Sequence, residues 1–98
     1  MRVVAYAPDL MDQSKLRGHG AEMVRSLDEL ADTEADLVLL DLARPGAVEA
    51  VGHIDAPVIG FGSHVDTELL EAARRAGGVE VLPRSQFFRR LPDLLSGL

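Results

Sequence analysis

Runs of apolar residues, separated by short amphipathic segments, divide the chain into regular units. The clearest run covers residues 37–42 and contains one carboxylate, Asp41, near its end. A continuous apolar run, rather than an alternating one, is typical of a strand covered on both faces, as in the parallel sheet of an α/β protein. We expect four further strands at 3–7, 21–25, 57–61 and 79–82.

Helix signals fill the intervals between these strands. Asp9, Ser26 and Asp66 stand where N-cap residues are expected, and Glu29 completes a capping box with Ser26. Pro45 is expected in the first turn of a further helix. The sequence therefore predicts five units of strand followed by helix.

Two of the predicted helices carry less regular patterns. The first is expected to use Leu10, Met11 and Leu16 as its apolar positions and to end at the glycines 18 and 20. The last follows Ser85, and Pro92 should break or restart it. Its apolar positions have helical spacing: Phe87, Leu91, Leu94, Leu95 and Leu98.

Five such units predict one α/β domain over residues 1–98, with a doubly wound, five-stranded parallel sheet between two layers of helices. The carboxyl ends of parallel strands meet at one edge, where such sheets keep their functional crevice. We expect the following residues to converge there: Asp9, Asp41, Gly62, Ser63, His64 and Arg84.

The third strand resembles the phosphoacceptor strand of bacterial response-regulator receiver domains, since it carries Asp41 near its end and Pro45 four residues later. The segments 57–59 and 73–82 also resemble the fourth strand and the approach to the fifth strand of that family. The resemblance implies a flavodoxin-like sheet of order 2-1-3-4-5. It also implies that Asp41 is the phosphoacceptor-equivalent residue.

A working receiver needs an acidic pair just after its first strand, because Mg²⁺ must be held there during phosphoryl transfer. The aligned positions are Ala7 and Pro8, and Asp9 lies one residue late. The family's hydroxyl residue falls on Gly62, and its lysine falls on Arg84. We therefore predict a pseudo-receiver in which the phosphorylation chemistry is lost, with no metal site, no cofactor and no enzymatic activity.

An alternative role for Asp41 is purely structural. In that case it caps the third helix and pairs with Arg84, so that a salt bridge holds two strand ends together. The two roles are compatible.

The resemblance implies an interface for a protein partner, a second copy of the chain included, on the last two helices. The candidate residues are aromatic and basic: Arg74, Arg75, Phe88, Arg89 and Arg90. Because Phe87 and Phe88 are adjacent, one of them should be partly exposed. Residues 1–73 carry a net charge of −9 and residues 74–98 one of +3, so the basic end suits an acidic partner.

Composition and charge indicate which partners and which cellular location to expect. The net charge of −6 works against nucleic-acid binding. The chain has no cysteine and no apolar run long enough for a membrane span. We therefore expect a cytoplasmic protein that does not bind membranes.

Two alternatives stay open. The first is a true phosphoacceptor, in which Asp9 and Asp41 hold Mg²⁺ and Asp41 takes the phosphoryl group. The second is a small-ligand-binding or hydrolytic protein that uses the crevice at Asp41, Ser63, His64 and Arg84. Ser63 lacks the Gly-x-Ser-x-Gly elbow of many hydrolases, which argues against the hydrolytic form.

Overall fold

The computed structural model describes residues 1–96, which form one parallel five-stranded sheet of order β2-β1-β3-β4-β5. This confirms the predicted fold class and strand order. The strands are β1 (Val3–Tyr6), β2 (Glu22–Met23), β3 (Leu37–Asp41), β4 (Val58–Gly62) and β5 (Glu80–Pro83).

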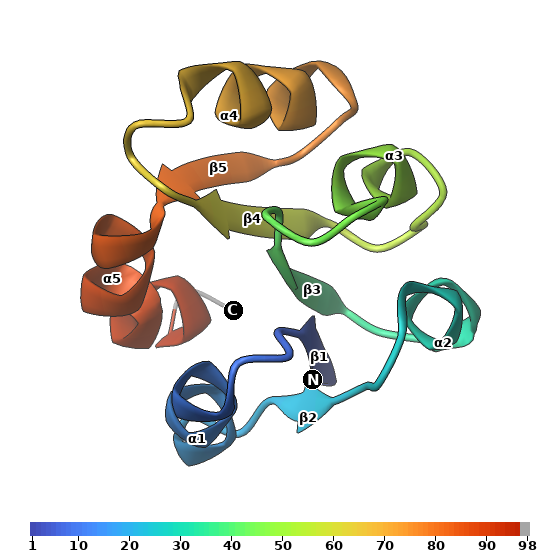
Figure 1. Ribbon diagram of the computed structural model, residues 1–98. Helices are drawn as coiled ribbons and strands as arrows, with labels where there is room; N and C mark the ends of the chain where they lie inside the picture. The colour runs from blue at the N-terminus through green and yellow to red at the C-terminus, as the bar shows by residue number, and fades with distance from the viewer. Residues whose placement is uncertain (97–98) are drawn as a thin grey trace.

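Five helices cover the two faces of this sheet (Figure 1). They are α1 (Leu10–Gly18), α2 (Leu27–Asp32), α3 (Ala47–Val51), α4 (Thr67–Arg75) and α5 (Arg84–Ser96). Helices α2, α3 and α4 lie on one face, and α1 and α5 lie on the other. The central strands β3 and β4 are buried at every residue, as the continuous apolar runs predict.

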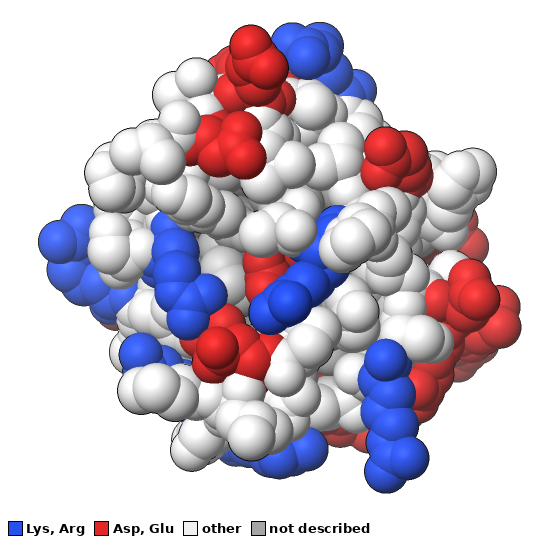
Figure 2. Space-filling view, in the orientation of Figure 1, with Lys and Arg blue, Asp and Glu red and all other residues white. Residues whose placement is uncertain are grey.

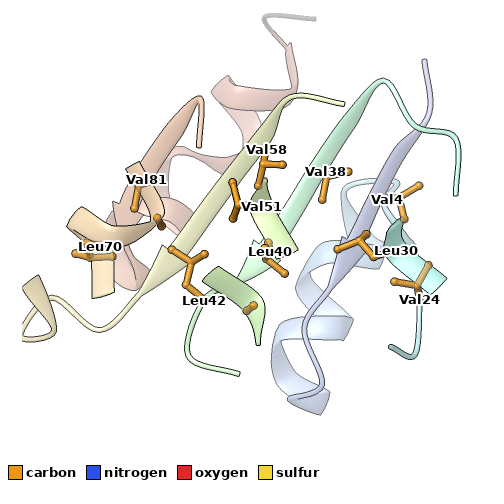
Figure 3. Packing of buried hydrophobic residues seen from close by; sticks show 12 residues of the cluster. Val4, Val24, Leu30, Val38, Leu40, Leu42, Val51, Val58, Leu70 and Val81 are labelled. Atoms are coloured by element: carbon orange, nitrogen blue, oxygen red, sulfur yellow. The ribbon is translucent and has the colours of Figure 1, made fainter. Parts of the chain in front are cut away.

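Each face of the sheet has its own apolar core. On one side, aliphatic side chains of the sheet and of α2, α3 and α4 pack together (Figure 3), among them Leu40 of β3, Leu42 just after it and Leu70 of α4. On the other side the core is partly aromatic, and Phe61 of β4 stacks on Phe87 of α5 with ring centroids 4.4 Å apart. The sheet is therefore held between an aliphatic layer and an aromatic one.

The predicted caps are present. Asp9 accepts hydrogen bonds from the backbone N–H groups of Met11 and Asp12, and Asp66 accepts one from Leu69. Ser26 accepts one from the Glu29 N–H. In isolation these helices would be marginal because of their short length, so side-chain caps matter for where they begin.

The rotation of α1 about its axis was predicted wrongly. Leu10 and Met11 are 79% and 71% exposed, whereas Asp12 and Leu16 are completely buried. Residues four apart lie about 40° apart around a helix, while Leu10 lies about 120° away from Leu16. Once Leu16 faces the sheet, the side chain that joins it in the core is that of Asp12.

Three smaller expectations also need correction. The third helix begins at Ala47, because Gly46 has a φ of +81° and forms its N-cap, so Pro45 lies in the preceding turn. Helix α5 continues through Pro92. Pro92 itself is exposed, and the packing of Leu91, Leu94 and Leu95 offsets the missing backbone hydrogen bond. The predicted apolar position Leu98 lies outside the described residues.

Gly60 allows β4 to approach Leu42 closely. A Cβ atom at Gly60 would lie 2.8 to 2.9 Å from three side-chain atoms of Leu42, which is 1% exposed. We expect Gly60→Ala to lower the free energy of unfolding by about 1 to 3 kcal/mol, because the core around Leu42 must shift. Urea denaturation followed by circular dichroism measures this change.

Gly18→Ala is the matched control, since a Cβ atom there meets nothing within 4 Å. It should leave stability unchanged or raise it slightly, because alanine is the better helix former. Equal stability of the Gly60→Ala protein and the wild type would contradict the packing argument.

Candidate functional site

The carboxyl ends of the strands form a crevice of about 380 Å³. Every residue predicted to converge at this edge lines it: Asp9, Asp41, Gly62, Ser63, His64 and Arg84. Ala43, Arg44, Phe61 and Ser85 complete the lining. Acidic and basic side chains lie close together at the centre of the face seen in Figure 2.

Asp41 is 5% exposed and has two partners. One oxygen, Oδ1, accepts a hydrogen bond from the backbone N–H of Ala43 at 3.1 Å. The other, Oδ2, accepts one from Nε of Arg44 at 3.2 Å. Arg44 comes from the loop after β3, so the strand and the loop that follows it supply both the acid and its counter-ion.

The predicted salt bridge between Asp41 and Arg84 is absent, and so is the predicted cap. Arg84 binds Asp12 instead, while the N-cap of the third helix is Gly46. Asp12 is the site residue that sequence reasoning missed. Helical geometry could have indicated it, because Asp12 shares the buried face of Leu16.

Asp12 and Arg84 form a two-armed ion pair across 72 residues of sequence. Nη1 of Arg84 donates to Oδ2 of Asp12 at 2.8 Å, and Nη2 donates to Oδ1. Asp12 is completely buried, whereas the Arg84 side chain is 45% exposed. The hydrogen bond to Asp12 raises the pKa of Arg84 above its usual value. Burial opposes this, and the charges of Asp12, Asp41 and Asp9 add smaller increases.

Arg84 also packs against the aromatic core. Its guanidinium carbon lies 5.9 Å from the centre of the Phe61 ring and 5.3 Å from that of Phe88. Lys15 of α1 lies over the same Phe88 ring at 4.9 Å. Two cations therefore contact Phe88, which is half-buried as the sequence predicted for one of the adjacent phenylalanines.

Ser63 and His64 are exposed and lie on the loop after β4. Oγ of Ser63 accepts a hydrogen bond from the Val65 N–H at 3.4 Å. Within residues 1–96 no hydrogen bond joins Ser63 to His64. This loop thus holds neither the elbow nor the relay that a serine nucleophile requires.

Two of the five predicted interface residues, Arg74 and Arg90, contact the edge strand β5. Arg74 of α4 donates to Glu71 and to the Val81 carbonyl oxygen, and Arg90 of α5 pairs with Glu80 at 2.9 Å. Arg75 and Arg89 are exposed, and neither forms an ion pair with a residue of the described chain. Because α4 and α5 lie on opposite faces of the sheet, this surface bends around β5.

The resemblance to receiver domains implies a Mg²⁺ site at this edge. The fit of the residues to that ion can be tested from their partners. Asp41 is bound to Arg44, Asp12 is bound to Arg84, and Oδ1 of Asp9 accepts two N–H groups of α1. Among residues 1–96, no three acidic or histidine side chains are grouped closely enough to hold a metal ion. Two of the three carboxylates are each paired with an arginine, which leaves Asp9 as the one acid of this set without a cationic partner in the described chain. This is a poor donor set for Mg²⁺, which prefers several uncompensated oxygen ligands.

The structure resembles several solved receiver domains. It matches the crystal structure of FixJ-N with a TM-score of 0.68 at 22% identity, over 86% of this chain and 82% of that one. It matches the receiver domain of the sensor histidine kinase PA1611 from Pseudomonas aeruginosa, which has a magnesium ion in its active-site cleft, with a TM-score of 0.73 at 15% identity. That match covers 97% of this chain and 94% of the other.

A third match is NtrX from Brucella abortus in complex with ADP, with a TM-score of 0.73 at 18% identity. It covers 98% of this chain but only 26% of NtrX, so the chain spans about a quarter of that protein. No family model matches the sequence, and no curated protein sequence matches it. The chain has the fold of response-regulator receiver domains.

None of the helices within residues 1–96 combines the length and the apolar character that crossing a membrane requires.

Asp9 generates a prediction about acid stability. The hydrogen bond from the Asp12 N–H has the largest effect and lowers the pKa of Asp9. Desolvation opposes it, and the Met11 N–H and the charges of Arg84 and Arg44 make smaller contributions to the lowering. Below the unfolded value, about 3.9, the unfolded chain binds a proton at Asp9 that the folded chain does not. The stability that the ionised Asp9 carboxylate contributes to the folded state is complete above this pH. It is lost as the pH falls through the lowered pKa of Asp9 in the folded chain.

We expect Asp9→Asn to stay close to the wild type at neutral pH, because asparagine also caps helices. Between about pH 4 and pH 2, however, its free energy of unfolding should fall less steeply than that of the wild type. Urea denaturation at a series of pH values measures both slopes. Identical slopes would contradict the assigned shift.

Proposed function

We propose that this chain is a pseudo-receiver of bacterial signal transduction, which acts in the cytoplasm through contacts with other proteins. In this proposal Asp41 does not serve as a Mg²⁺-dependent phosphoacceptor, and the chain catalyses no reaction of its own. The observation that carries the proposal is the ion pair between Asp41 and Arg44.

The Asp41–Arg44 pair bears on the chemistry because phosphoryl transfer needs a free carboxylate oxygen and a cation that contacts the transferring group. Both oxygens of Asp41 are hydrogen-bonded, and the adjacent cation is a guanidinium. To bind Mg²⁺ at this edge, Asp41 would have to release Arg44. The second acid of the crevice mouth, Asp9, uses Oδ1 to cap α1, so its Oδ2 is the oxygen that a metal ion could contact without disturbing the cap.

The surface around β5 supports binding to a protein partner. It combines two exposed arginines, Arg75 and Arg89, with the half-buried aromatic ring of Phe88. Arginine and aromatic residues are enriched at protein interfaces. We propose an acidic partner surface, and a second copy of this chain is one candidate.

A second candidate function is the binding of a small ligand in the crevice. Its volume of about 380 Å³ falls at the lower end of the range for ligand sites. A ligand there would meet the ring of Phe61 together with the polar side chains of Ser63, His64 and Arg44. The absence of a hydrogen bond between Ser63 and His64 favours binding over hydrolysis.

Phosphorylation gives the direct test of the main proposal. We expect that incubation with Mg²⁺ and acetyl phosphate leaves the mass of the chain unchanged, because Arg44 occupies the place of the metal at Asp41. Intact-protein and peptide mass spectrometry measure this outcome. A Mg²⁺-dependent adduct on Asp41 that is absent from Asp41→Asn would contradict the proposal, and Arg44→Ala shows whether removal of the guanidinium restores the reaction.

The interface is tested by Arg89→Glu. We expect this variant to weaken association at least several-fold, because it places a negative charge opposite an acidic partner surface. Its stability should change by no more than about 0.5 kcal/mol, since Arg89 is exposed. Sedimentation velocity over a range of concentrations measures self-association. For any identified partner, the dissociation constant of the complex is measured instead.

Arg17→Glu makes the same charge change at an exposed position on α1 and serves as the control. It should leave association nearly unchanged. Equal weakening by both variants would mean that net charge, rather than the β5 surface, determines association.

A further inference from the structure

Three carboxylates lie around the Arg84 guanidinium: Asp12 binds it, and Asp41 and Asp9 line the same crevice. Asp9 is exposed, and its Oδ1 caps α1. Asp12 binds both terminal nitrogen atoms, one of them at 2.8 Å. Asp41 lines the same crevice, but its charged partner is Arg44 at 3.2 Å. Two of these carboxylates, Asp12 and Asp41, are buried, and Arg84 binds the more deeply buried one, Asp12.

The position of Arg84 also affects the aromatic core. On Asp12, its guanidinium lies 5.3 Å from the centre of the Phe88 ring. The Phe88 ring packs edge-on against Phe61 and Phe87, with centroids 5.4 and 4.9 Å away. Since Phe88 is half-buried, the side of its ring that is not covered by these two phenylalanines is covered in part by Arg84.

We infer that Asp12 is a positioning residue: its buried carboxylate holds the Arg84 guanidinium against Phe88 and away from Asp41, and so gives the aromatic surface of α5 a single orientation. The importance of this orientation for partner binding rests on the proposed function. The inference about Asp12 itself does not.

The burial of the two side chains explains why Arg84 stays on Asp12. Asp12 is completely buried, so losing its partner would leave a charge without solvent or a counter-ion. The Arg84 side chain is 45% exposed and could turn at little cost to itself. The desolvated carboxylate therefore determines the position. Once Asp12 is neutral, we expect Arg84 to turn to Asp41, the other buried carboxylate, which lines the same crevice.

Four chains test this inference by nuclear magnetic resonance: the wild type, Asp12→Asn, Asp41→Asn and the double variant. Two signals are followed in each chain. The first is the nuclear Overhauser effect between Arg84 and the Phe88 ring. The second is the slowed exchange of the Arg84 guanidinium protons, which a two-armed ion pair produces.

We expect Asp41→Asn to leave both signals as in the wild type. In Asp12→Asn the contact with Phe88 should be lost while the guanidinium protons remain protected, because Arg84 turns to Asp41. In the double variant both signals should be lost. Asp93→Asn, at an exposed acid of the same helix, is the matched control and should change neither signal.

Two results would overturn the inference. One is an unchanged contact between Arg84 and Phe88 in Asp12→Asn. The other is an equal loss of this contact in Asp41→Asn. Both are measured on the isolated chain without phosphoryl donor or partner, so failure of the proposed function and failure of this inference are distinguishable.

A variant in which Asp12→Leu and Arg84→Met are combined decides the question if Asp12→Asn does not fold. Replacing a buried ion pair by apolar side chains often leaves stability unchanged or raises it. We expect this chain to fold with weakened and averaged contacts between the Phe88 ring and the rings of Phe61 and Phe87. Ring contacts as strong as those of the wild type would show that Phe88 needs no support from Arg84, and would overturn the inference.

Discussion

A carboxylate buried at the edge of a sheet needs a counter-ion, and this requirement organises the polar side chains of the molecule. Asp12 enters the core on the same face of α1 as Leu16, and its charge is compensated by Arg84 at the start of α5. This pair joins the first helix to the last across the sheet. Its geometry also fixes the distance between Arg84 and the rings of Phe61 and Phe88, so the aromatic layer of the core depends on an electrostatic contact.

The same requirement applies to Asp41, and the chain meets it locally. Arg44, three residues further on, supplies the cation, and the Ala43 N–H supplies a second hydrogen bond. In a fold whose receiver relatives include one with a magnesium ion in its cleft, the positive charge at this edge comes from side chains of the chain itself. Side-chain cations are always present, whereas an ion from solution binds only at sufficient concentration. The chain's own arginines therefore lower the net negative charge of this edge.

The strands follow from the sequence because each central strand is a continuous apolar run that only a doubly covered sheet can bury. Their order was implied by the resemblance to receiver domains. The caps at Asp9, Ser26 and Asp66 follow from local hydrogen bonding. The rotation of α1 does not follow from hydropathy, because nine residues with three scattered apolar side chains leave the buried face ambiguous. The roles of Asp12 and Arg44 were missed for a related reason: the first depends on that rotation, and the second depends on the path of a loop.

The position of Phe88 connects the crevice to the surface around β5. Its ring packs against core aromatics on one side and faces cations from α1 and α5 on the other. A side chain that belongs to both the core and the surface transmits a change at one to the other, because packed rings cannot move independently. A partner that contacts Phe88 would therefore be sensitive to the ion pair at Asp12, even though Asp12 itself is completely buried and cannot be touched from outside.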